Sequence, residues 1–135
     1  MGSYKRIEQC IAHYIAPRYR QVVEVGVGGN YHAAWYLASQ GVKIICTDRA
    51  PRNGQGLLTV YRDDIFHPRE ELYRGADLIY AIRPGVEMVP PLIALAQRIG
   101  ADLLVYHPGD ELYGNGGEVV ECGVPLHRYH PPSRT

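Results

Sequence analysis

The stretch VVEVGVGGNYHAAWYLASQG, residues 22–41, joins an apolar run to a helix-like pattern through a cluster of glycines. Gly26 and Gly28 fit the first two positions of the G-x-G-x-x-G turn, which receives a pyrophosphate at a helix N-terminus, but Tyr31 occupies the third. Glu24 also lies just before the turn, and a carboxylate repels a pyrophosphate, more strongly as the site loses water. The stretch therefore predicts a strand, a tight turn and a helix around a ligand crevice, and it disfavours a dinucleotide.

Strand-like and helix-like patterns alternate through most of the chain. Helical spacing or capping signals predict helices over 4–15, 31–40, 69–74 and 88–100. Apolar runs predict strands over 21–25, 42–48, 57–65, 76–82 and 101–109. This alternation indicates an α/β protein with a Rossmann-like, doubly wound, mainly parallel five-stranded sheet in the order 3-2-1-4-5, with helices on both faces.

The last part of the chain has a different pattern. Residues 119–123 and 125–129 are spaced as a short hairpin, and 131–135 read as a frayed tail. With 135 residues, we expect one domain over 1–130. The hairpin is the segment best placed to cover the late edge of the sheet or to pair two copies as a homodimer.

Composition excludes several kinds of protein. Fourteen basic and fourteen acidic residues give zero formal charge, so nucleic-acid binding is not indicated. The N-terminus lacks the apolar core of a signal peptide and no membrane-spanning run occurs, which predicts a soluble cytoplasmic protein with free cysteines. His127 and His130 fall on opposite faces of the predicted hairpin strand, and we predict no metal site.

The strand ends favour a different nucleoside ligand from a dinucleotide. The carboxyl ends of parallel strands meet at one edge of the sheet, where ligands bind. S-adenosylmethionine carries an ammonium and a sulfonium, which Glu24 can attract, and a carboxylate, which the helix N-terminus can receive. Asp48 ends the second strand, 22 positions after Gly26, which is about the sequence separation at which an acid meets ribose hydroxyls. Asp48 fits NAD and S-adenosylmethionine equally well.

These segments also resemble a known superfamily. EVGVGGN, Asp48 closing VKIICTD, and Asp64 in YRDDI resemble the first three motifs of class I S-adenosylmethionine-dependent methyltransferases. VVEVGVGGN, RDDIFHPREELYRGADLIYAIRPG and the chain length resemble a small uncharacterised archaeal family of Rossmann-like proteins, over residues 1 to about 110. The resemblance implies Glu24, Gly26 and Gly28 at the methionine end, Asp48 at the ribose, and Asp64 with Ile65 near the adenine.

Two departures from the superfamily pattern bear on activity. Asn30 replaces a frequent third glycine, although we keep it among the cofactor-binding candidates, and little chain follows the fifth strand to build a substrate wall. The pair Asp63-Asp64 also fits an Asx turn before Pro68, and Asp48 fits a cap or a loop ion pair.

Catalytic groups are sparse. His107 and Tyr106 are the candidate proton acceptors. Arg83 could clamp a carboxylate or phosphate, or form an ion pair with Glu87 or Asp64. The first hypothesis is an S-adenosylmethionine-binding, methyltransferase-like domain with an unknown acceptor. The alternatives are a non-catalytic nucleotide-binding or regulatory module and, less favoured, an NAD-binding domain.

Overall fold

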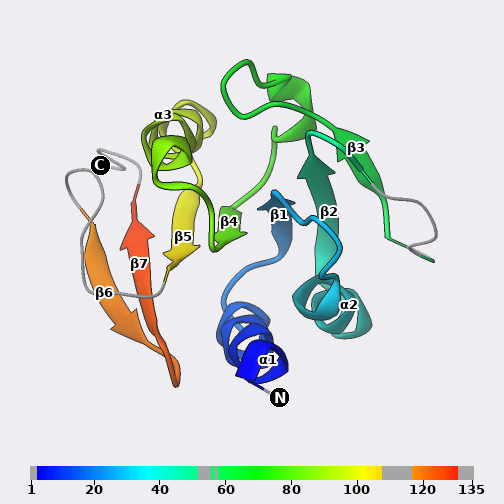
Figure 1. Cartoon of the computed structure of the whole chain (residues 1–135), viewed down its shortest axis with the longest axis vertical. Coiled ribbons are helices and arrows are strands. Elements are labelled where there is room, and N and C mark those ends of the chain that lie inside the picture. The colour runs from blue at the N-terminus through cyan, green and yellow to red at the C-terminus, as the bar shows by residue number, and fades with distance from the viewer. Residues whose placement is uncertain (1–2, 52–55, 57, 108–116, 131–135) are drawn as a thin grey trace.

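Seven strands form one sheet in the order β3-β2-β1-β4-β5-β7-β6 (Figure 1). The computed structural model describes residues 3–51, 56, 58–107 and 117–130; the predicted tail 131–135 lies outside these ranges. The first five strands are parallel, and the hairpin continues the sheet with antiparallel pairing. They are β1 Gln21–Val25, β2 Lys43–Asp48, β3 Val60–Arg62, β4 Leu78–Ile82, β5 Asp102–Tyr106, β6 Glu118–Glu121 and β7 Pro125–Tyr129. The predicted strand order and hairpin are confirmed.

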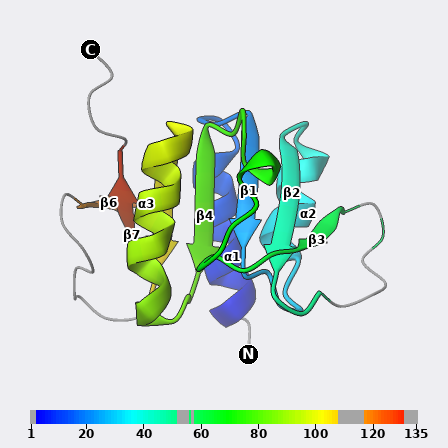
Figure 2. The ribbon, with the colours of Figure 1, turned by 90° about the horizontal axis from the view of Figure 1, so that it is seen from above.

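Helices cover both faces of the sheet. α1 (Ser3–Ile15) and α2 (His32–Ser39) lie on one face, whereas α3 (Val89–Ile99) lies on the other (Figure 2). Two short 3₁₀ turns, η1 (Glu70–Leu72) and η2 (Val86–Met88), precede β4 and α3. The two prolines of α3 occupy its first turn, where the missing N–H groups leave no intrahelical bond unmade.

Alternation along the central strands separates two apolar layers. Val23 and Val25 of β1 pack on the α3 face, and Val22 packs on the α1/α2 face. Neighbouring strands follow the same rule, because successive side chains of a strand point to opposite faces. A run that looks uniformly apolar in sequence therefore supplies two different cores, and the position of a polar residue in the run decides which core it enters.

The third predicted strand is shorter than expected. Its regular part is Val60–Arg62; of the predicted range 57–65, residue 57 lies outside the described residues, and 58–59 and 63–65 are not strand. The Asp64 Oδ1 atom accepts the N–H of Phe66, and the Asp64 carbonyl accepts the N–H of His67, which is the Asx turn that the sequence offered as an alternative. This turn ends the strand and directs the chain across the edge of the sheet.

The structure also bears on membrane-spanning helices, cysteines and metal sites. None of the helices in the described part of the chain combines the length and apolarity that a bilayer crossing requires. All three cysteines are free thiols. Residues 3–51, 56, 58–107 and 117–130 contain no group of three or more side chains arranged to hold a metal ion.

Candidate functional site

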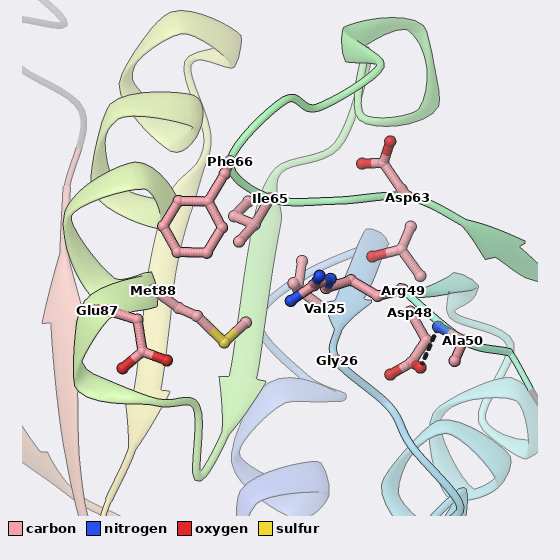
Figure 3. A pocket seen from close by; sticks show the side chains of 11 residues that line it. Val25, Gly26, Asp48, Arg49, Ala50, Asp63, Ile65, Phe66, Glu87 and Met88 are labelled. Carbon is pink, nitrogen blue, oxygen red and sulfur yellow. Dashed lines mark hydrogen bonds between the residues drawn. The ribbon is translucent and has the colours of Figure 1, made fainter.

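A cavity of about 510 Å³ opens at the carboxyl ends of β1 and β2 and beside η2 (Figure 3). Its volume falls within the range of small-molecule sites. Gly26 lies between the Asp48 and Met88 side chains in Figure 3, so the predicted glycine turn forms part of the wall. The lining residues are Val25, Gly26, Thr47, Asp48, Arg49, Ala50, Asp63, Ile65, Phe66, Glu87 and Met88.

Asp48 connects the glycine turn to the loop after β2. Its Oδ1 atom accepts the Gly28 N–H at 3.0 Å, and its Oδ2 atom accepts the Ala50 N–H at 2.9 Å. Gly26 and Gly28 have φ angles of 73° and 58°, which glycine adopts without the clash that a Cβ causes. Asp48 thus holds the turn and also faces the cavity, where its remaining lone pairs can accept hydroxyl groups.

Asp63 forms the part of the wall that the sequence assigned to Asp64. The Tyr73 hydroxyl donates to Asp63 Oδ2 at 2.7 Å, and the Arg69 N–H donates to Asp63 Oδ1 at 3.0 Å. Burial raises the pKa of the Tyr73 hydroxyl, which therefore stays a donor. Ile65 lines the cavity as expected, whereas Asp64 is absent from the lining because its carboxylate caps the Asx turn.

Sequence reasoning missed Phe66, Glu87, Met88 and Arg49. Phe66 follows Ile65 directly and leaves 44% of its surface exposed, which is unusual for a phenylalanine. Arg49 follows Asp48 in the same way. Each of these two lies one residue beyond a predicted site residue, so extending the strand ends by one position would have found them. Glu87 and Met88 come from η2, which the sequence did not predict.

Glu24 lies on the other face of the sheet from the cavity. The Tyr80 hydroxyl donates to Glu24 Oε1 at 2.7 Å, and the Glu24 side chain is buried. Burial raises the pKa of Glu24 to about 8, so the carboxyl is mostly neutral at pH 7. The expected attraction of an ionised Glu24 for a sulfonium does not fit this geometry, because strand alternation turns Val25 and not Glu24 toward the cavity.

Arg83 pairs with a residue that sequence reasoning did not consider. Its Nη1 atom lies 3.4 Å from Oε2 of Glu8 in α1, whereas the sequence suggested Glu87 or Asp64 as the partner. The Asn30 amide donates to the same oxygen at 2.9 Å, and Asn30 Oδ1 accepts the His32 N–H near the start of α2. Seventy-five positions separate Glu8 from Arg83, and no local pattern links them.

The two candidate proton acceptors lie on opposite faces of the sheet. Tyr106 is buried on the α1/α2 face, with the Arg83 guanidinium carbon 5.4 Å from its ring centroid. His107 is buried beside β7, where its Nε2 atom lies 3.0 Å from Nδ1 of His127. The residues that line the cavity include neither Tyr106 nor His107.

Solved structures similar to this chain include methyltransferases. An S-adenosylmethionine-bound amino pentose methyltransferase from Micromonospora echinaspora superposes with a TM-score of 0.60 at 17% identity, covering 88% of this chain and 58% of that one. A methyltransferase from Archaeoglobus fulgidus described as S-adenosylmethionine-dependent gives 0.57 at 16% identity, with 76% and 52% covered. At these identities the likeness shows a shared methyltransferase-like Rossmann fold. This chain spans slightly more than half the length of the two neighbours.

Sequence relatives come from archaea. The UPF0146 protein of Archaeoglobus fulgidus is 38% identical over 106 residues, covering 78% of each chain. The UPF0146 protein of Pyrococcus horikoshii is 32% identical over 129 residues, covering 90% of this chain and 98% of its own. Residues 7–124 match the family described as "Uncharacterised protein family (UPF0146)". The chain belongs to this family.

Proposed function

We propose that this chain is an S-adenosylmethionine-binding domain of the methyltransferase type, with the nucleoside in the cavity beside Gly26. The observation that carries the proposal is the position of the cavity at the carboxyl ends of β1 and β2, with Asp48 in its wall. The Asp48 carboxylate would accept the ribose hydroxyls, and Ile65 and Phe66 would contact the adenine. The methyltransferase fold of the structural neighbours supports the same ligand class.

The charges of the wall favour a sulfonium over a diphosphate. Asp48, Asp63 and Glu87 supply three carboxyl groups, and Arg49 supplies one guanidinium. Arg69 partly offsets Asp63, at 3.6 Å. The remaining negative potential attracts a cationic ligand and repels a pyrophosphate. This argument replaces the one based on Glu24, because it uses side chains that face the cavity.

Titration calorimetry tests the ligand. We expect S-adenosylmethionine and S-adenosylhomocysteine to bind in the micromolar range, and NAD and ATP to bind more weakly. Asp48→Asn should weaken S-adenosylhomocysteine about tenfold or more, because it removes a charged acceptor for the ribose hydroxyls. Phe66→Ala should weaken it without touching the glycine turn, and Glu70→Gln, at an exposed site on η1, is the control. Tighter binding of NAD than of S-adenosylhomocysteine would contradict the proposal.

A regulatory module that binds the same ligand without catalysis is the second candidate. The specific observation in its favour is that the two candidate proton acceptors, His107 and Tyr106, lie outside the described lining of the cavity. Transfer of a labelled methyl group, measured over a panel of small-molecule and macromolecular acceptors, separates the two candidates. Incorporated label favours the enzyme, and binding with no incorporation favours the regulatory module.

A further inference from the structure

Five polar side chains meet on the α1/α2 face behind the glycine turn. Glu8 comes from α1, Glu24 from β1, Asn30 from the turn, Tyr80 from β4, and Arg83 from the residue after β4. Asn30 contacts Glu8 at 2.9 Å, Arg83 contacts Glu8 at 3.4 Å and Tyr80 contacts Glu24 at 2.7 Å. We call this group the Glu8–Arg83 cluster.

Two features of the cluster are typical of a ligand site: a buried oxygen without a hydrogen-bond partner among the described residues and a strained backbone conformation. The Glu8 side chain is 2% exposed, yet its Oε1 atom has no hydrogen-bond partner among the described residues. A buried carboxylate oxygen without a donor is unfavourable, and such atoms are rare in folded proteins. Arg83 has a φ angle of 56°, a left-handed conformation that side chains other than glycine seldom adopt and that concentrates at functional sites.

The glycine turn connects this cluster to the cavity. Asp48 in the cavity wall accepts the Gly28 N–H, and two residues later Asn30 donates to Glu8. A Cβ at Gly26 would stand 3.8 Å from the Met88 methyl group of the cavity wall. The glycine turn therefore connects the cavity wall to Glu8 through two hydrogen bonds.

The cluster is complementary to a zwitterion. Glu8 offers a carboxylate and Arg83 a guanidinium, and the two groups neutralise each other at 3.4 Å. An α-amino acid presents an ammonium and a carboxylate at a similar spacing. If it enters between them, each buried charge keeps an opposite partner, so the ion pair can open without leaving a charge uncompensated. Arg83 can bind the carboxylate with two parallel N–H donors.

We propose that Glu8 and Arg83 hold the zwitterionic amino-acid end of the ligand, with Glu8 on the ammonium and Arg83 on the carboxylate. This proposal rests on the function proposed above and assigns the ammonium to an acid of α1 instead of the acid of β1. Glu24 then serves as a neutral neighbour that keeps Tyr80 in position. The amino-acid end and the nucleoside are recognised on opposite sides of the glycine turn.

Two ligands that differ at one end test the assignment. S-adenosylhomocysteine carries the amino-acid end, and 5′-methylthioadenosine has the same nucleoside and sulfur without it. Glu8→Gln and Arg83→Met should each weaken S-adenosylhomocysteine about tenfold to hundredfold and leave 5′-methylthioadenosine within about twofold. Arg83→Lys should recover part of the loss, and Glu24→Gln should change neither ligand. Arg98→Met, at an exposed ion pair, is the matched control for charge removal.

The outcomes separate this inference from the proposed function. Equal affinity of the wild type and both variants for S-adenosylhomocysteine, or equal loss of both ligands, overturns the inference while the function stands. Failure of the wild type to bind either ligand overturns both. Should a variant fail to fold by circular dichroism, wild-type affinities for S-adenosylhomocysteine analogues lacking the amino or the carboxyl group decide the matter. Each deletion should cost at least about tenfold, and no loss from either deletion contradicts the proposal.

Discussion

The two faces of the sheet differ most where the glycine turn crosses its edge. On the α3 face, the turn borders an open cavity, two of whose acids are already hydrogen-bonded, Asp48 to two backbone N–H groups and Asp63 to Tyr73 and Arg69. On the α1/α2 face, Glu8 is buried and keeps one oxygen without a partner among the described residues. One step along β1, from Val25 to Glu24, separates the cavity from the buried polar groups.

The largest expected effect comes from removing the support beneath the cavity. Tyr73 is 1% exposed and its hydroxyl binds both Asp63 and Thr47. Tyr73→Ala should lower the free energy of unfolding by about 3–5 kcal/mol, since it deletes a buried ring and removes the hydroxyl that donates to Asp63 Oδ2. Urea denaturation measures this loss. Tyr61→Ala, at an exposed tyrosine of β3, should change it by less than about 1 kcal/mol, and equal losses would contradict the comparison.

A pH titration tests whether the buried Glu24 on the α1/α2 face is neutral. Because the pKa of Glu24 is raised to about 8, the folded protein binds a proton that the unfolded chain releases near its ordinary pKa of 4.5. Stability should therefore be full below pH 4.5 and fall as pH rises toward 8, by up to about 1.4 kcal/mol per pH unit. Glu24→Gln should remove this slope. Urea denaturation between pH 5 and 8.5 provides the measurement, and identical slopes in the two proteins would exclude a neutral buried Glu24.

His127 in β7 should titrate in the opposite direction. Burial, with a smaller contribution from His107, lowers the pKa of His127 below its usual value of 6.5. The stability contributed by this neutral imidazole is present above pH 6.5 and is lost as pH falls through the lowered value. His127→Phe should flatten the acid limb of the stability curve. Unfolding curves from pH 7 to 5 measure it, and an unchanged acid limb would mean that His127 titrates as it does when unfolded.

The sequence made the fold predictable because most of the parallel strands are apolar runs bounded by glycine, proline or an acid. These signals are local, so the strands, the prolines of α3 and the hairpin could be read from neighbouring residues, and the strand order followed from the rule for right-handed crossovers. The strand over 57–65 was overestimated because Asp64 satisfies the backbone with its own side chain, which a β-propensity pattern does not reveal.

The site was less predictable because it depends on faces and distant pairs. Glu24 was assigned to the ligand from its place in the motif, although its offset of one residue from Val25 indicates the other face. Asp48 was predicted from the convergence of strand ends in a parallel sheet, and Ile65 from the superfamily motif; both line the cavity. The contact between Glu8 and Arg83 joins α1 to the end of β4, and no pattern in the sequence around either residue predicts it.

The hairpin covers the late edge of β5 but presents an edge of its own. Glu118 and Glu121 stand at the two ends of β6, and both are exposed. An antiparallel pairing of two centred β6 strands would bring these acids opposite each other, which destabilises a strand pair. The homodimer expected through this hairpin therefore stays a prediction, and the charges of β6 disfavour this particular pairing.

The smallest expected effect concerns an ion pair that resembles Glu8–Arg83 in composition but not in surroundings. Arg98 Nε lies 2.6 Å from Glu70 Oε2, closer than the buried pair, yet 48% and 39% of the two side chains are exposed. Water and salt screen such a pair, so Arg98→Met should lower the free energy of unfolding by no more than about 0.5 kcal/mol, and by less in 0.5 M salt. Urea denaturation at two salt concentrations measures this. A loss as large as that of Arg83→Met would show that distance, and not burial, determines what an ion pair contributes in this protein.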